Sequence, residues 1–345
     1  MLDKVYLEIT EECNLECINC FRKAWKRQAM EMDDPALQKL IAEINHSESI
    51  QTVVLGGIGE PFLSGSFEKT VDQLRGKSVW VTTNGLHLRE KLTPVLIKNI
   101  DKLIVSADGM EKNMLAIRGI QMDEWLQNIA HLNQLKKQYT SDTPVLEIQF
   151  VASRQNIADI FPLMDILAGM NVHKIHISHM LPVDDEGAGQ ILYKRYENRE
   201  TRELFNKIRN YSFKKGLQVV LPEYELRTER HCAFVDNNAT YVTAQGLVVP
   251  CYRFSHDGRE YVFGRKKTIL QYSFGSVKEK ALNDIWESLP YRSFRSRIYN
   301  NQYPSCTDCD LVEGCDLVNH TEFDCHGQNP SCSDCVWARN FVFCH

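Results

Sequence analysis

The feature that most constrains the fold is an alternation of short β-branched runs with amphipathic stretches across residues 5–215. Strand-like runs occupy residues 5–10, 52–56, 78–82, 102–106, 145–151 and 174–178. Apolar residues at the three- and four-residue spacing typical of helices occur at residues 35–45, 67–74, 89–98, 124–137, 157–170 and 200–215. Six strand–helix units in a row predict a parallel sheet with right-handed crossovers, either open and doubly wound or curved into a partial barrel.

Four polar motifs directly follow strands of this predicted sheet. A segment with three cysteines (residues 13–20) follows the first strand, and "GGIGEP" (56–61) follows the second. "TTNG" (82–85) and "SADG" (106–109) follow the third and fourth. Because the carboxyl ends of parallel strands lie at one edge, where α/β proteins bind their ligands, the four motifs predict a single site.

The twelve cysteines are unevenly distributed. Cys13, Cys17 and Cys20 form a CxxxCxxC segment, residues 21–231 contain no cysteine, and nine follow from Cys232 to Cys344. A secreted disulfide scaffold would be shorter and would carry a signal peptide. Three crowded thiols can instead hold an iron–sulfur cluster with one iron left open, bind zinc with a fourth ligand from elsewhere, or simply pack in the core.

The composition argues against several kinds of partner. The net charge is −5 and no block of basic residues occurs, so we expect no binding to nucleic acid or to anionic lipid. The N-terminus lacks the layout of a signal peptide, and no apolar window approaches the roughly 20 residues of a membrane span. We therefore expect a cytoplasmic protein that does not bind membranes.

The strand–helix rhythm stops near residues 217–231. Beyond Cys232, strand-like pieces and many Cys, Asp, Asn and Gly residues replace it. This change predicts two domains, residues 1–220 and residues 221–345.

The first domain resembles the radical S-adenosylmethionine (radical SAM) superfamily, because CxxxCxxC follows the first strand and the later motifs occur in the family's order. The resemblance implies a partial (β/α)6 TIM-like barrel in which Cys13, Cys17 and Cys20 ligate a [4Fe-4S] cluster. S-adenosylmethionine would bind the open iron. Reductive cleavage would then give a 5′-deoxyadenosyl radical that abstracts hydrogen from a substrate.

The resemblance also implies contacts to S-adenosylmethionine. The glycine-rich motif would bring bare backbone to the methionine amino group. Glu60 would either contact this amino group or be a solvated loop carboxylate. The polar strand ends would contact the ribose and the amino-acid part, and an arginine would pair with the methionine carboxylate. The residues in question are Gly57, Gly59, Glu60, Asn84, Ser106, Asp108 and Arg118.

One position departs from the family pattern. Asn19 stands where the family often has an aromatic residue near the adenine. Adenine contacts must then come from elsewhere, with Phe21 and residues 176–181 as candidates.

The cysteines of the second domain resemble the SPASM extension, which holds two auxiliary [4Fe-4S] clusters. By position, one cluster would take Cys306, Cys309, Cys315 and Cys335, and the other Cys232, Cys251, Cys325 and Cys332. Asn319 replaces a usual cysteine, and Cys344 is left over. A zinc site made by Cys306, Cys309, Cys332 and Cys335 is the alternative.

Nearly the whole chain resembles radical SAM maturases associated with tungsten-cofactor oxidoreductases, in "CFRKAW", "GGIGEPF", "VSADG" with "IRG", and most specifically in the tail "DCHGQNPSCSDCVWARNFVFC". This implies a maturase that acts on a cofactor or protein in trans, with a small electron donor such as ferredoxin or flavodoxin. Two alternatives are a maturase that crosslinks, epimerises or oxidises a ribosomal peptide, and a non-catalytic iron–sulfur carrier or scaffold.

Overall fold

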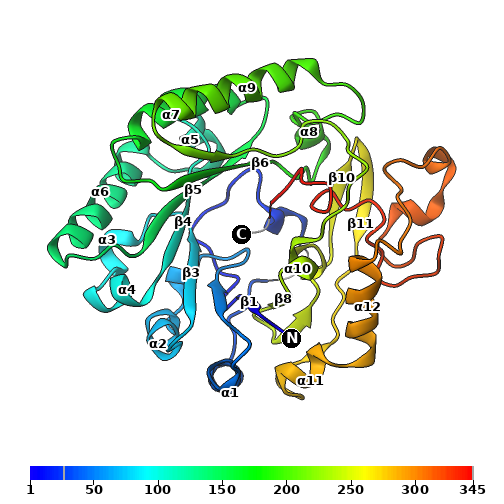
Figure 1. Cartoon of the computed structure of the whole chain (residues 1–345), viewed down its shortest axis with the longest axis horizontal. Coiled ribbons are helices and arrows are strands. Elements are labelled where there is room, and N and C mark those ends of the chain that lie inside the picture. The colour runs from blue at the N-terminus through cyan, green and yellow to red at the C-terminus, as the bar shows by residue number, and fades with distance from the viewer. Residues whose placement is uncertain (26–27, 344–345) are drawn as a thin grey trace.

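The six predicted strands form the centre of one long, curved sheet. The computed structural model describes residues 1–25 and 28–343, and within them the strand order is β12-β9-β8-β1-β2-β3-β4-β5-β6-β7. Strand β8 and strands β1 to β7 run parallel to one another, and the sheet curls into the predicted partial barrel (Figure 1). Its parallel strands are β1 Lys4–Leu7, β2 Thr52–Leu55, β3 Ser78–Thr83, β4 Lys102–Ser106, β5 Val145–Ala152, β6 Lys174–His179, β7 Gln218–Val220 and β8 Ala239–Val242.

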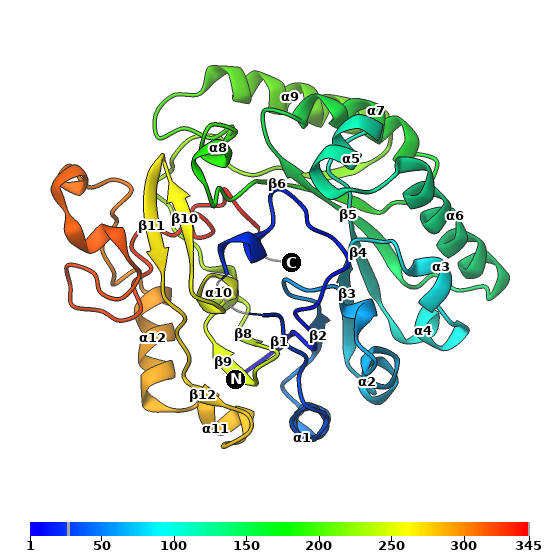
Figure 2. The same ribbon diagram turned by 180° about the vertical axis from the view of Figure 1, so that it is seen from behind.

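Helices cover the outer face of this sheet (Figures 1 and 2). Helix α1 covers the stretch predicted at residues 35–45 and begins at Asp34, because the Asp33 side chain accepts a hydrogen bond from the amide of Ala36. The predicted helix at residues 89–98 is instead two, because Thr93 caps a second helix that starts at Pro94. These helices are α1 Asp34–His46, α2 Phe67–Gln73, α3 Leu88–Lys91, α4 Pro94–Asn99, α5 Glu111–Arg118, α6 Met122–Gln138, α7 Ile160–Leu167, α8 Asp185–Ala188 and α9 Arg199–Lys214.

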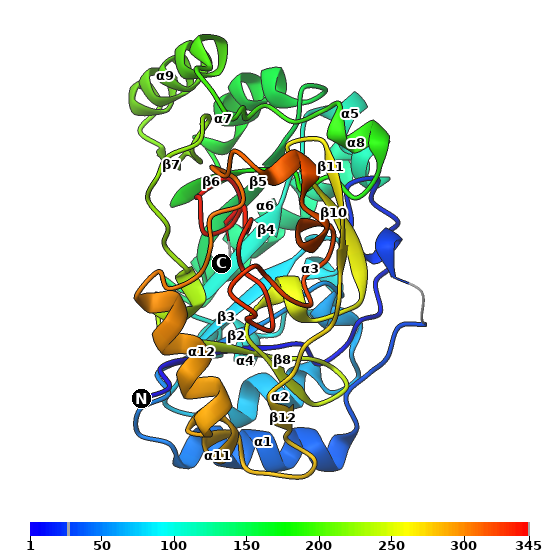
Figure 3. The ribbon, with the colours of Figure 1, turned by 90° about the vertical axis from the view of Figure 1, so that its right-hand side faces the viewer.

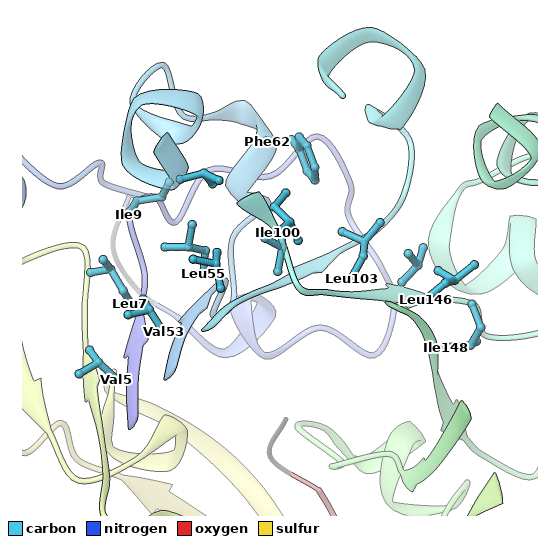
Figure 4. Packing of buried hydrophobic residues seen from close by; sticks show 14 of the residues in the cluster. Val5, Leu7, Ile9, Val53, Leu55, Phe62, Ile100, Leu103, Leu146 and Ile148 are labelled. Carbon is cyan, nitrogen blue, oxygen red and sulfur yellow. The ribbon is translucent and has the colours of Figure 1, made fainter. Parts of the chain in front are cut away.

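The main core lies between the sheet and these helices. Figure 4 shows Val5, Leu7, Val53 and Leu55 projecting from neighbouring strands into it, and all four are fully buried. Alternate residues face the inside of the barrel, where Tyr6 belongs to a smaller apolar cluster. The strands are therefore buried on both faces, which explains their continuous apolar runs.

The cysteine-rich region joins the same sheet rather than standing apart from it. Strand β8 pairs in parallel with β1, and β9 Leu247–Val249 and β12 Gly275–Ser276 extend this edge in antiparallel fashion. The region also contains the hairpin β10 Gly258–Val262 and β11 Arg265–Ile269, with helices α10 Ala233–Asp236, α11 Leu282–Trp286 and α12 Leu289–Tyr299. A division at residue 220 thus remains a prediction.

No helix in the described ranges has both the length and the apolar character that crossing a membrane requires.

Candidate functional site

The motifs after the strands meet around a cavity of about 290 Å³ at the carboxyl ends of the parallel strands. The predicted residues that line it are Cys13, Cys20, Gly57, Gly59, Glu60, Asn84, Ser106 and Arg118. Cys17 and Asp108 lie just behind this lining, since both interact with Arg118. The sequence-predicted residues are therefore brought together in one place.

The three N-terminal thiols converge on one another. Burial raises the pKa of each thiol, and a neighbouring thiol adds to this shift: Cys17 acts on Cys13, Cys20 on Cys17, and Cys13 on Cys20. The three partly buried thiols therefore lie close enough together to share one metal group, which would lower the pKa of each thiol on binding. Three ligands on one short loop beside the cavity fit an iron–sulfur cluster, which Cys13, Cys17 and Cys20 would hold.

Glu60 is not a solvated loop carboxylate. It is 2% exposed and accepts hydrogen bonds from the Thr83 hydroxyl (2.8 Å), the Asn84 amide (2.8 Å) and the Phe62 amide (3.3 Å). Burial raises the pKa of this carboxyl. Glu60 thus holds the loops after β2 and β3 in a fixed relation at the cavity wall.

The glycines of "GGIGEP" are required mainly by packing against the end of β1. Gly57 has a φ of +132°, and a Cβ there would lie 2.5 Å from the Tyr241 hydroxyl. A Cβ on Gly59 would lie 2.2 Å from the backbone oxygen of Thr10. The resemblance implies that these glycines allow close approach of a ligand, and the structure gives a second reason inside the protein.

Arg118 is held in place by a buried carboxylate. Its Nε donates to Asp108 Oδ2 at 2.7 Å, and Asp108 Oδ1 accepts from the amide of Val151 at 2.7 Å. Arg118 is the last residue of α5, and Gly119 ends that helix in the left-handed conformation. The guanidinium therefore reaches the cavity from a fixed point and can offer its remaining N–H groups to an anionic ligand.

The candidates for adenine contact have different surroundings. Asn19 lines the cavity, as do Ser178, His179 and Leu181. His176 instead pairs with Glu147 inside the barrel at 2.7 Å, as a structural histidine would. The Phe21 side chain lies outside the described part of the structure.

The auxiliary cysteines are grouped differently from the predicted partition. Burial raises the pKa of Cys332 well above its ordinary value, and the nearby thiols of Cys335, Cys251 and Cys232 raise it further. Cys232, Cys251 and Cys335 also line one cavity of about 80 Å³. Cys325 is instead a neighbour of Cys306. Cys335 thus lies near Cys232, Cys251 and Cys332, and Cys325 lies near Cys306, whereas the prediction placed Cys325 in the first set and Cys335 in the second. Cys344 lies outside the described residues.

The spacing of the sulfurs does not support the zinc alternative. Zinc with four thiolates at about 2.3 Å places the sulfurs only about 3.8 Å apart. Within residues 1–25 and 28–343, the three potential ligands whose ligand atoms all lie within 4.8 Å are Glu8, Glu11 and His256, not cysteines. No three cysteine sulfurs of the described residues lie that close to one another.

Four cavity residues come from the cysteine-rich region: Tyr252, Trp337, Val342 and Phe343. None of these four residues is among the site residues predicted from the sequence. The last three reach the site because the segment after Cys335 runs along the end of β6, where the His179 amide donates to the backbone oxygen of Phe341 at 3.1 Å. Nothing in their local sequence signals this long-range contact.

Comparisons with known proteins agree with this geometry. Residues 7–159 match the description "Radical SAM superfamily" and residues 232–310 match SPASM, an "Iron-sulfur cluster-binding domain". The chain is 35% identical to the tungsten-containing aldehyde ferredoxin oxidoreductase cofactor-modifying protein of Pyrococcus furiosus, covering 99% of this chain and 96% of that one. A probable GTP 3′,8-cyclase of Saccharolobus islandicus is 26% identical, covering 63% of this chain and 68% of that one.

Solved structures share the fold at low identity. Streptococcus suis SuiB, bound to S-adenosylmethionine, superposes with a TM-score of 0.61 at 15% identity, covering 92% of this chain and 72% of SuiB. The anSMEcpe structure with bound AdoMet gives a TM-score of 0.59 at 14% identity, covering 92% of this chain and 88% of that chain.

Proposed function

Because the chain belongs to the radical SAM superfamily and carries a SPASM-type iron–sulfur domain, we propose that it is a maturase for the cofactor of a tungsten-dependent oxidoreductase. The observation that carries this proposal is the similarity over nearly the full length of both chains to a protein named for modifying such a cofactor. The substrate, whether the cofactor alone or the protein that holds it, would bind in trans.

The residues at the catalytic end of the cavity fit S-adenosylmethionine. Cys13, Cys17 and Cys20 would hold the [4Fe-4S] cluster, and Arg118 would pair with the methionine carboxylate. When bound, the cluster would supply the one electron needed for reductive cleavage of S-adenosylmethionine to a 5′-deoxyadenosyl radical, which would abstract hydrogen from the substrate. The protein would contribute orientation, because Glu60 fixes the loops after β2 and β3 and Asp108 fixes Arg118.

Two auxiliary clusters fit the remaining cysteines. Following the observed neighbours, one would use Cys232, Cys251, Cys332 and Cys335, and the other Cys306, Cys309, Cys315 and Cys325. The first set lies directly behind the wall of the catalytic cavity, because Tyr252, Trp337, Val342 and Phe343 line both spaces.

A ferredoxin or flavodoxin would supply electrons from the side of the CxxxCxxC loop. This loop is partly exposed, and Ile18 within it is 41% exposed. A small redox protein could therefore approach the cluster closely without entering the cavity.

The proposal is tested with anaerobically reconstituted protein, a chemical reductant and S-adenosylmethionine. The wild type should form 5′-deoxyadenosine, and the triple substitution of Cys13, Cys17 and Cys20 by Ala should abolish this while auxiliary iron remains. Incubation with the tungsten oxidoreductase should then change the mass of its extracted cofactor. If no 5′-deoxyadenosine forms, the enzyme assignment fails; if only a peptide is modified, the substrate assignment fails.

A further inference from the structure

The catalytic cavity has a second end whose character differs from the first. The end next to Cys13 and Cys20 carries the charged groups, Glu60 and Arg118. The end next to the auxiliary cysteines is walled by Tyr252, Trp337 and Phe343 with Val342. S-adenosylmethionine accounts for the charged end under the proposed function and leaves the aromatic end for another ligand.

The aromatic wall is built from segments fixed by other contacts. Tyr252 directly follows Cys251, and its ring packs against Tyr241 (centroids 4.8 Å), Tyr6 (5.4 Å) and Phe234 (5.7 Å). Trp337 stands two residues after Cys335. Both side chains border three separate cavities, so part of each faces open volume.

The third aromatic residue is held by the backbone of the C-terminal segment. The Phe343 amide donates to the Ser178 hydroxyl at 3.1 Å. Two residues earlier, Phe341 is fully buried and stacks on Tyr193 with ring centroids 4.5 Å apart. Figure 3 shows this red segment beside β6, leading toward the space that the sheet encloses.

The polar groups near this wall favour an uncharged ligand that donates hydrogen bonds. Under the proposed function the remaining N–H groups of Arg118 pair with the methionine carboxylate, and Glu60 already accepts three hydrogen bonds, so neither charge is left to balance a charged substrate. Gln149 also lines the cavity, and its buried Oε1 accepts no hydrogen bond from the described residues. That oxygen needs an N–H or O–H group from a ligand.

We propose that Tyr252, Trp337 and Phe343 form the substrate subsite, and that it takes a flat, uncharged heteroaromatic ring that donates an N–H to Gln149. This inference rests on the proposed function and names its substrate class. Aromatic walls favour flat conjugated rings over aliphatic chains or extended peptide, since stacked pairs gain about 0.5–1.5 kcal/mol each beyond their buried area.

The test uses pterin, a flat heterocycle with N–H donors, as the probe. Its binding to the reconstituted holoenzyme is measured by calorimetry at saturating S-adenosylmethionine. Trp337→Ala and Tyr252→Ala should each weaken pterin binding about tenfold or more, whereas Tyr252→Phe, which keeps the ring, should restore it. Phe213→Ala, at an 86% exposed position on α9, is the control and should bind as the wild type does.

Two further measurements separate the explanations. Gln149→Leu should weaken binding of pterin but not of quinoxaline, a flat ring without N–H donors. Absence of pterin binding, equal binding by Trp337→Ala, or preferential binding of a short peptide would each overturn the subsite. Formation of 5′-deoxyadenosine is assayed in parallel. A protein that cleaves S-adenosylmethionine but does not bind pterin would refute the proposed subsite and leave the proposed function standing.

Discussion

At the scale of single residues, Glu8 shows how an inward-facing acid is tolerated at the end of β1. It is fully buried and accepts a hydrogen bond from the Ile58 amide at 3.0 Å. Burial raises its pKa to about 7, and the nearby Glu11 adds to the shift. Glu8 therefore retains a proton in the folded protein at pH values where the unfolded chain has already lost it.

This protonation predicts a specific pH dependence of stability. Because the folded state binds the extra proton between pH 4.5 and about 7, stability falls as pH rises through this window and levels off above it. Glu8→Gln removes the titrating group. When the pH rises from about 6 to about 8, the free energy of unfolding should fall by roughly 1 kcal/mol more in the wild type than in the variant. The unfolding midpoints of both proteins at the two pH values measure this difference. An equal change of midpoint in the wild type and in Glu8→Gln would contradict the prediction.

Arg118 gives a second prediction at this scale. Arg118→Lys replaces a planar fork with a point charge and should weaken S-adenosylmethionine binding about tenfold or more. Asp108→Asn retains an oxygen for the Val151 amide but removes the negative partner of Arg118. It should weaken binding less than Arg118→Lys does. Calorimetry on the reconstituted proteins gives both values, and the reverse order would mean that Arg118 acts only structurally.

At the scale of secondary-structure elements, α5 matters because its last residue is Arg118. The helix ends at Gly119, whose φ is +75°. A Cβ at Gly119 would meet no heavy atom within 4 Å. A substitution there therefore changes only the backbone preference of the helix end.

Gly119→Ala should cost about 1 kcal/mol of stability and should also weaken S-adenosylmethionine binding, because the helix end that positions Arg118 is disturbed. Gly216→Ala is a matched control, with a φ of +70° after α9 and equally open space. It should lose similar stability without a change in binding. If Gly119→Ala and Gly216→Ala bound S-adenosylmethionine equally well, the position of Arg118 would not depend on how α5 ends.

The elements that could be predicted from sequence are those whose signal is local. Strands such as β2 have continuous apolar runs because both faces are buried, and α1 has its Asp33 cap and Pro35. Helix α5 was missed because its eight residues bury only Met114 and Ile117. The grouping of Cys335 with Cys232, and the arrival of Phe343 at the cavity, depend on contacts between distant segments that spacing alone does not encode.

At the scale of the whole molecule, the cysteine arrangement predicts three metal clusters with distinct positions. Intact protein should contain about twelve iron and twelve sulfide, and removing one cubane should leave about eight of each. Triple substitution of Cys232, Cys251 and Cys335 by Ala should remove the cluster that borders the catalytic cavity. Triple substitution of Cys306, Cys309 and Cys325 should remove the more distant one.

The two variants are distinguished by the coupling between auxiliary and catalytic clusters in electron paramagnetic resonance. Loss of the nearer cluster should abolish any magnetic interaction with the cluster at Cys13, Cys17 and Cys20, whereas loss of the distant one should preserve it. Iron contents of about four in both variants would mean that Cys325 and Cys335 do not divide between the clusters as proposed.

The pairing of β1 with β8 has a consequence for how the chain is made. Residues 4–7 leave the ribosome early, yet one of their two hydrogen-bonded partners, residues 239–242, follows only after the rest of the barrel. Until then β1 presents a bare strand edge beside the three thiols that must receive iron. During synthesis, metal delivery to the thiols and protection of the β1 edge are therefore needed at the same time. In a fragment that stops before β8, the edge of β1 would stay unpaired.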